Sequence, residues 1–239
     1  SQIFKGLHDL ELKYKDTGVF VRGKYWYDAE LQDGNRPHKD ISNKGRKEGA
    51  KTRGAEILDA FVYHNYAIGD QPGTVRLGKQ VVSWGESTFI MNSINSVNPL
   101  DASAFRRPGA ELKEGLIPVN MFFVSQNLTD QLSMEAFYQI GWKQTVVDNC
   151  GTFFSSADVA ADGCDNNYHI LDRQLTDLLK GVDGANALGV PGIINTGTVG
   201  INYSDEGLLV KRGRDNKAKN DGQFGLAFRW LGDNTEYGA

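Results

Sequence analysis

The chain has 239 residues, of which 40% are hydrophobic, 10% are aromatic and 28 are glycines. Its 26 basic and 30 acidic residues are interspersed and give a net charge of −4, so there is no basic face for nucleic acid and we expect no nucleic-acid partner. Apolar runs are only a few residues long, which excludes a membrane-spanning helix of about 20 apolar residues but leaves a β-barrel open.

The N-terminal part predicts a β-hairpin. Apolar and polar side chains alternate over residues 8–15, a tight-turn sequence follows at 16–18, and the alternation resumes over 19–28. Period-two alternation gives each strand two unlike faces. Strands of about ten residues are long enough to cross a bilayer when tilted.

A second pair of strands follows a long polar loop. Residues 30–54 lack periodicity and predict an exposed loop, after which strands are predicted at 55–67 and 74–84. In the first of these strands, Leu58 and Val62 should face away from Asp59. The orientation of the second strand is ambiguous, because alternation places Arg76 and Lys79 on opposite faces.

A long connection at 85–115 precedes the third pair of strands. It carries a short helical stretch that Asp101 can cap. The strand predicted at 117–126 places Ile117, Val119, Met121 and Phe123 on one side. In the strand predicted at 132–142, every second residue is apolar, and Glu135 and Gln139 lie on the other face. Alternation alone does not decide whether the apolar face meets a protein core or lipid.

The longest excursion spans 148–221 and contains both cysteines, Cys150 and Cys164. No histidine has the spacing of a zinc site, so a disulfide and an oxidising compartment are predicted, with two unrelated free thiols as the alternative. Residues 168–180 predict an amphipathic helix and 198–211 an extra hairpin. A last strand at 223–231 precedes a tight turn at 232–234.

The connections alternate between short and long along the whole chain. The turns at 16–18, 68–73, 127–131 and 232–234 are short, whereas the intervening connections are long. Bacterial outer-membrane barrels sort their connections in this way, with short periplasmic turns and long external loops. The sequence therefore predicts an all-β fold, an antiparallel transmembrane β-barrel with about seven visible strands and a short helix in one external loop.

Several stretches of the chain resemble the bacterial family known as domain of unknown function 1302. They are the segments 77–87, 98–99, 107–114, 128–130, 134–139 and 222–227. The resemblance implies an exported outer-membrane β-barrel, located in the bacterial outer membrane and contacting its lipid. It also implies association with a periplasmic lipoprotein and an efflux-type permease, which suggests transport of small, hydrophobic molecules but names no substrate.

We expect residues 1–239 to form a single barrel fragment of a longer chain, with 148–221 as a large extracellular loop region. A barrel must close, since an unpaired strand edge in lipid leaves backbone groups unsatisfied. An odd number of strands does not close in the usual way, and residues after the turn at 232–234 resemble the start of another strand.

If the apolar faces meet lipid, the opposite faces line a lumen. The predicted lumen-lining residues are Arg22, Lys24, Asp28, Asp59, Glu135, Gln139, Lys143 and Arg229. If the loop 86–114 folds inward, it forms a constriction with charged residues at its edge. If it does not, the loop forms an external cap. The charged residues are Arg106, Arg107, Glu111, Lys113 and Glu114.

The sequence favours a channel or transport component over an enzyme. The four histidines are scattered, and no nucleophile-elbow motif occurs. No cofactor is expected and no metal site either, because Asp158, Asp162 and Asp165 do not match an EF-hand loop. A soluble β-sandwich or lipocalin-like module that binds a small molecule remains the alternative.

Overall fold

The computed structural model describes residues 2–34, 41–84, 97–156, 158–170, 173, 174, 177, 201–204 and 206–239. The chain divides into two compact units. The first unit comprises Ser1–Asn35, Thr52–Val146 and Lys217–Ala239, and the second comprises Arg36–Lys51 and Val147–Asn216. Each unit is described separately below.

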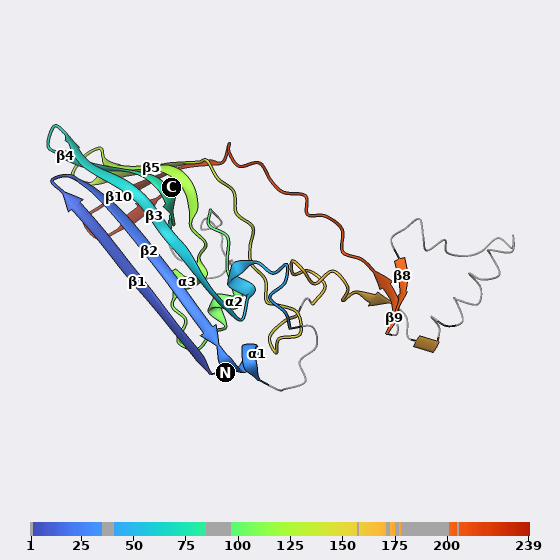
Figure 1. The fold of residues 1–239 in the computed structure, drawn as a ribbon. Coiled ribbons are helices and arrows are strands. Elements are labelled where there is room, and N and C mark those ends of the chain that lie inside the picture. Colours follow the sequence, from blue (N-terminus) through green and yellow to red (C-terminus); the bar gives the residue numbers. More distant parts are fainter. Residues whose placement is uncertain are drawn as a thin grey trace, which may run out of the picture. The chain divides into compact units, whose positions relative to one another are not determined.

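The first unit is built on one antiparallel sheet of eight strands, in the order β1-β2-β3-β4-β5-β6-β10-β11. Figure 1 shows β1 to β5 side by side, each following its predecessor in the chain. The mostly β architecture of the prediction is therefore confirmed. The strands are β1 (Ile3–Tyr14), β2 (Thr17–Asp28), β3 (Arg53–Ile68), β4 (Gln71–Gln80), β5 (Val119–Asn127), β6 (Leu132–Gln139), β10 (Phe224–Leu231) and β11 (Glu236–Gly238).

Turn chemistry places the hairpins where the sequence predicts them. β1 and β2 pair in unbroken register from Ile3↔Asp28 to Tyr14↔Thr17, and Lys15 takes a left-handed conformation (φ 54°) in the turn between them. Gly69 takes the same conformation (φ 62°) between β3 and β4, where a side chain would be strained. The final turn leads into β11, which pairs with β10.

One predicted side-chain direction is wrong because β3 contains a bulge. The register with β2 shifts between Val21 and Gly23, so that Leu58 and Asp59 together lie opposite Arg22. Two residues of one strand facing one residue of its partner interrupt the alternation. Leu58 is consequently buried like Asp59, instead of sharing the exposed face with Val62.

The structure also settles which way β4 and β5 face. Arg76 pairs with Tyr63 and Phe123, whereas Lys79 lies on the opposite face, beside Ala60. In β5, Val119, Met121 and Phe123 share one side as predicted, and this side is buried within unit 1. They pack with Val82 and Phe137, so the sheet face that carries the charges also carries an apolar cluster.

Between β4 and β5 the described chain resumes at residue 97 and contains two short helices, α2 (Ala102–Phe105) and α3 (Leu112–Gly115). The predicted cap is confirmed: the Asp101 carboxylate accepts a hydrogen bond from the Ala104 N–H. Residues 85–96 lie outside the described part. The predicted loop 30–54 contains α1 (Ala29–Asp33) and a 3₁₀ turn, η1 (Glu48–Ala50).

The second unit contains a three-stranded sheet and the disulfide. Its strands, in the order β7-β9-β8, are β7 (His169–Ile170), β9 (Gly207–Val210) and β8 (Ile201–Ser204). The predicted hairpin at 198–211 is confirmed by the pairing of β8 with β9. Most of the predicted helix 168–180 lies outside the described residues. At its start, His169 and Ile170 form a strand instead, paired with β9, whereas the described residues 173, 174 and 177 are helical as predicted.

Candidate functional site

One face of the eight-stranded sheet is largely apolar and exposed, although it also carries Lys79 and Asn120. A single cross-strand row connects seven strands through directly paired residues, all of them apolar. The exposed fractions in this row range from 40% to 77%, whereas a water-soluble sheet would bury such a row in its core. The row, which we call the apolar row, consists of Leu12, Val19, Val62, Leu77, Phe122, Tyr138 and Phe224.

The opposite face, which we call the charged face, carries ion pairs along its length. Arg22 on β2 binds both carboxylate oxygens of Asp9 on β1, at 2.7 and 2.8 Å. It also reaches Asp59 at 3.5 Å, which stands beside it because of the bulge in β3. A bidentate guanidinium–carboxylate pair of this kind holds both groups in a defined geometry.

Arg76 on β4 lies among aromatic rings of the charged face. Its guanidinium is 4.1 Å from the centre of the Phe123 ring and 5.6 Å from that of Phe61. These distances fall within the range of cation–π interactions. Across the described residues, neither a hydrogen bond nor an ion pair is found for Arg76.

A segment between β4 and β5, residues 97–118, folds onto the charged face, and we call it the inward segment. Its anchor is the ammonium group of Lys24, which contacts Asp101 at 3.1 Å, the Glu114 carbonyl at 3.2 Å and Glu56 of β3 at 3.3 Å. The Lys24 and Asp101 side chains are only 3% and 2% exposed. Three acceptors therefore satisfy the three donors of a buried lysine.

A second anchor joins the inward segment to β1. Lys5 binds the Glu114 carboxylate and the Gly109 carbonyl, both at 2.8 Å. The same Glu114 carboxylate accepts the Glu111 N–H and so closes the capping box of α3. Figure 1 shows α2 and α3 on the same side of the first strands.

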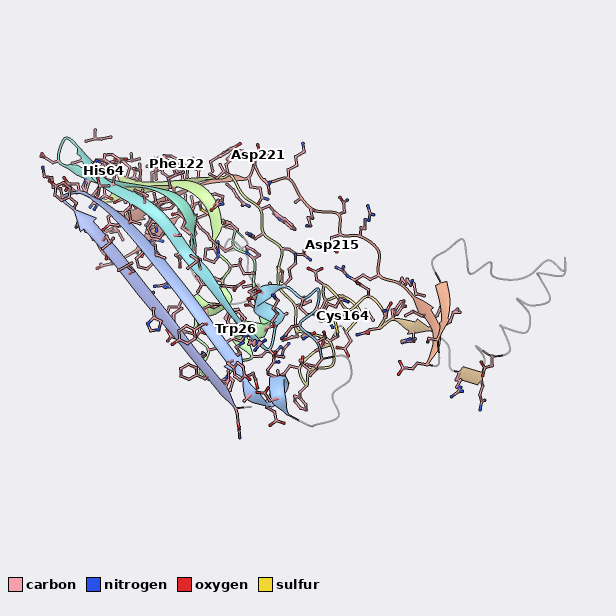
Figure 2. The ribbon with its side chains drawn as sticks, in the orientation of Figure 1. Trp26, His64, Phe122, Cys164, Asp215 and Asp221 are labelled. Carbon is pink, nitrogen blue, oxygen red and sulfur yellow. A yellow bond between two sulfur atoms is a disulfide. The ribbon has the colours of Figure 1, made fainter. Side chains whose placement is uncertain are left out.

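The guanidinium of Arg107 lies 4.1 Å from the centre of the Trp26 ring, and Trp26 is only 3% exposed. Burial lowers the pKa of Arg107, and the charges of Asp101 and Glu56 oppose that effect. In Figure 2, Trp26 and His64 mark opposite ends of the strands, so the inward segment contacts the end to which the long connections attach.

At the other edge of the charged face, Trp84 borders a cavity of about 440 Å³. Its indole N–H donates to the Glu135 carboxylate at 2.8 Å, and its ring packs against Phe137 with 5.1 Å between centres. Gly225 lies beneath both rings, since a Cβ there would stand 2.5 Å from Phe137 and 2.6 Å from Trp84. The cavity size falls within the range of small-molecule sites.

Of the predicted lumen-lining residues, seven lie on strands with the charged face, and Lys143 follows the end of β6 instead. Lys24, Asp28, Asp59 and Gln139 are each less than one-tenth exposed, so they form a packed layer. Arg22, Glu135 and Arg229 are more accessible.

Two of the predicted constriction residues, Arg107 and Glu114, belong to the inward segment's contacts with the sheet. Lys113 and Glu111 pair with each other at 2.9 Å with more exposed side chains, and Arg106 is exposed at the end of α2. The prediction missed Lys5, Asp9 and Arg76. Alternation in the predicted strand 8–15 indicated the face of Asp9, whereas Lys5 lies before that strand and nothing in β4 identified the face of Arg76.

In the second unit, the predicted disulfide between Cys150 and Cys164 is present, with Cα atoms 6.2 Å apart. Arg46 is buried beside it and donates to the Asn149 side chain at 2.5 Å and to the Cys150 sulfur at 2.8 Å. Asp162 accepts from Lys47 and Arg212, both at 3.0 Å. The disulfide and these polar contacts together connect three segments of this unit.

None of the helices in the described ranges combines the length and the apolar character required to span a bilayer. No group of three or more metal-ligating side chains is found within those ranges either. No curated protein and no solved structure matches the chain. A family model described as "Protein of unknown function (DUF1302)" matches residues 1–239. The chain therefore belongs to the DUF1302 family.

Proposed function

We propose that the chain is a wall of an outer-membrane β-barrel that serves as a channel or transport component for small compounds, hydrophobic ones included. The observation that carries the proposal is the apolar row, which crosses seven neighbouring strands without a polar side chain. Lipid would cover this face, and the charged face would line a hydrated interior.

Strand lengths and connections support the same proposal. β1 and β2 have 12 residues each and β3 has 16, well beyond the five or six typical of soluble sheets. The short turns after β1, β3, β5 and β10 all lie at one end of the sheet, because successive strands are antiparallel. Outer-membrane barrels have this asymmetry.

In this proposal the inward segment narrows the interior. It is tied to the charged face by the buried Lys24–Asp101 pair and by Lys5–Glu114. Charges on such a constriction select solutes by size and by sign. The associated proteins would be a periplasmic lipoprotein and an efflux-type permease, as the resemblance of the sequence implies.

We favour transport over catalysis because the described histidines stand apart from one another. His8 contacts Tyr25, His64 contacts Thr17, and His169 pairs with Glu206 in the second unit. Among the described residues, none of these contacts combines a nucleophile, a base and an orienting group. The function would then depend on pore width, segment position and interior charge.

Cysteine accessibility in membranes tests the proposal. Leu10 and Glu11 are adjacent on β1, with Leu10 on the apolar face and Glu11 on the charged face, and both are exposed in the chain alone. A membrane-impermeant maleimide should label Glu11→Cys in outer-membrane vesicles made permeable to small molecules, and should spare Leu10→Cys. Equal labelling, or recovery of the protein from the soluble fraction without detergent, would favour the soluble binding module instead.

A further inference from the structure

We infer that Arg76 is a solute-binding residue that takes the carboxylate of an amphipathic anion whose apolar ring lies on the neighbouring aromatic side chains. This inference rests on the proposed function, because it requires the charged face to be the surface that solutes meet. It adds to that function a binding position and a chemical class of substrate.

The first argument is the cross-strand row that contains Arg76. The paired positions of this row, from β1 to β10, are Lys13, Gly18, Tyr63, Arg76, Phe123, Phe137 and Gly225. Lys13 is charged too, at the β1 end of the row, but only Arg76 lies among the three aromatic residues Tyr63, Phe123 and Phe137. An apolar surface with one cation in the middle matches a ring compound that carries one negative charge.

Two glycines of this row, Gly18 and Gly225, let the neighbouring aromatic rings lie flat against the sheet. A Cβ on Gly18 would lie 2.4 Å from the Tyr63 ring, and one on Gly225 would lie 2.5 Å from Phe137. Tyr63 therefore lies over Gly18, and Phe137 over Gly225. Both rings bend away from Arg76, toward the positions that lack a side chain.

The second argument is that Arg76 is unpaired while the carboxylates near it are engaged. The charges that act most on Arg76 are those of Glu135 and Asp59. Glu135 accepts the Trp84 indole N–H at 2.8 Å, and Asp59 contacts Arg22 at 3.5 Å. In the described part of the chain, the five guanidinium donors of Arg76 meet no acceptor, whereas those of Arg22 bind Asp9.

The third argument is the space that continues from this row. Phe123 pairs with Phe137, Phe137 packs on Trp84, and Trp84 borders the cavity of about 440 Å³. A single aromatic or alicyclic ring with a short acidic chain fits within such a volume. Aromatic side chains thus extend continuously from the cation to the cavity.

Binding of 4-phenylbutyrate to the full-length protein in detergent micelles tests the inference by calorimetry, with empty micelles as the blank. Arg76→Gln should raise the Kd about tenfold or more, the usual effect of losing a charge-assisted hydrogen bond. Lys13→Gln removes a positive charge from the β1 end of the same face, away from Asp59 and Glu135, and should change the Kd less than about twofold. The neutral 4-phenylbutyramide should bind weakly and equally to all variants.

Arg76→Lys retains the charge but loses the planar fork, and should raise the Kd severalfold, so it replaces Arg76→Gln if that variant does not fold. An unchanged Kd in the Arg76 variants, or equal binding of acid and amide by wild type, would overturn the inference. Conductance of the same preparation in a planar bilayer is measured separately. Absent conductance with Arg76-dependent binding would reject the channel alone, and normal conductance without such binding would reject the inference alone.

Discussion

Removing the Lys24 ammonium should release the inward segment from the sheet. Lys24 is the residue on which Asp101, the Glu114 carbonyl and Glu56 converge, and the Lys24 and Asp101 side chains are 3% and 2% exposed. In Lys24→Met, the apolar stem is retained and the charge is lost. Asp101 then keeps its helix-capping bond but has lost its counter-charge.

The expected size of this effect follows from the burial of the Lys24–Asp101 pair. Removing one partner of a buried ion pair typically costs about 3–5 kcal/mol, because the other charge is left uncompensated. If the segment can avoid this cost by undocking, its undocked population rises by at least about 100-fold, since each 1.4 kcal/mol is a factor of ten. The remaining anchor, Lys5–Glu114, is more exposed, at 21% and 8%, and should not restore the docked state alone.

A single engineered thiol reports this population. Ala104 in α2 is fully buried, and both native cysteines are in the disulfide, so Ala104→Cys provides the only free thiol of the chain. The maleimide labelling rate at this position should rise about 100-fold with Lys24→Met, in proportion to the undocked fraction. Single-channel conductance should rise in parallel.

Lys13→Met is the matched control, because Lys13 is an exposed lysine on the charged side of β1. It removes the same charge and should leave the labelling rate at Ala104→Cys unchanged. If Lys24→Met also leaves that rate unchanged, the buried pair does not hold the segment. The docking would then depend on the packing of Arg107 on Trp26 and on the apolar cluster.

Three further predictions concern packing and the second unit. Gly225→Ala should destabilise the protein by about 1–3 kcal/mol in urea titrations and shift tryptophan emission, because the new methyl group clashes with Phe137 and Trp84. Gly238→Ala is its control, because a methyl group there has no atom within 4 Å. Burial raises the pKa of Asp162, but Lys47 and Arg212 outweigh burial and hold the pKa below 3.8. The stabilisation by the ionised Asp162 carboxylate is therefore complete above that pH and is lost as the pH falls through the lower folded-state pKa. Asp162→Asn should make the melting temperature depend less on pH in the acidic range. Arg46→Met should increase proteolysis of residues 41–51, because Asn149 loses a buried hydrogen-bond donor at a cost of about 1–3 kcal/mol. Equal protease resistance of the variant and wild type would contradict a stabilising role of Arg46.

Local sequence patterns predicted the strands and hairpins well, because alternation and turn residues act over a few positions. The β1–β2 hairpin and the β8–β9 hairpin needed only such signals. The bulge at Leu58 could not be predicted, since it depends on the register with β2, and nothing in the sequence of β3 marks it. A single extra residue reversed the expected side-chain direction.

The candidate site was predictable only where one strand carries the signal. Arg22 and Lys24 lie on a strand with clear alternation, and the structure places them on the same sheet face as Asp59. The inward segment depends on contacts between distant positions, with Lys24 and Asp101 separated by 77 residues and Lys5 and Glu114 by 109. The sheet face on which it packs therefore could not be predicted from a local pattern.

The inward segment and Arg76 lie at different heights along the strands, so their effects on transport can be measured separately. Lys24 lies toward the end of β2 that joins the long connections, whereas Arg76 lies in the row of Gly18, near the short turns. A solute that enters from the long-connection end would meet the inward segment before Arg76. Undocking the segment should therefore raise the flux of all small solutes alike, while Arg76→Gln should change only that of ring carboxylates. A selective change in Lys24→Met would mean that the segment itself recognises the solute.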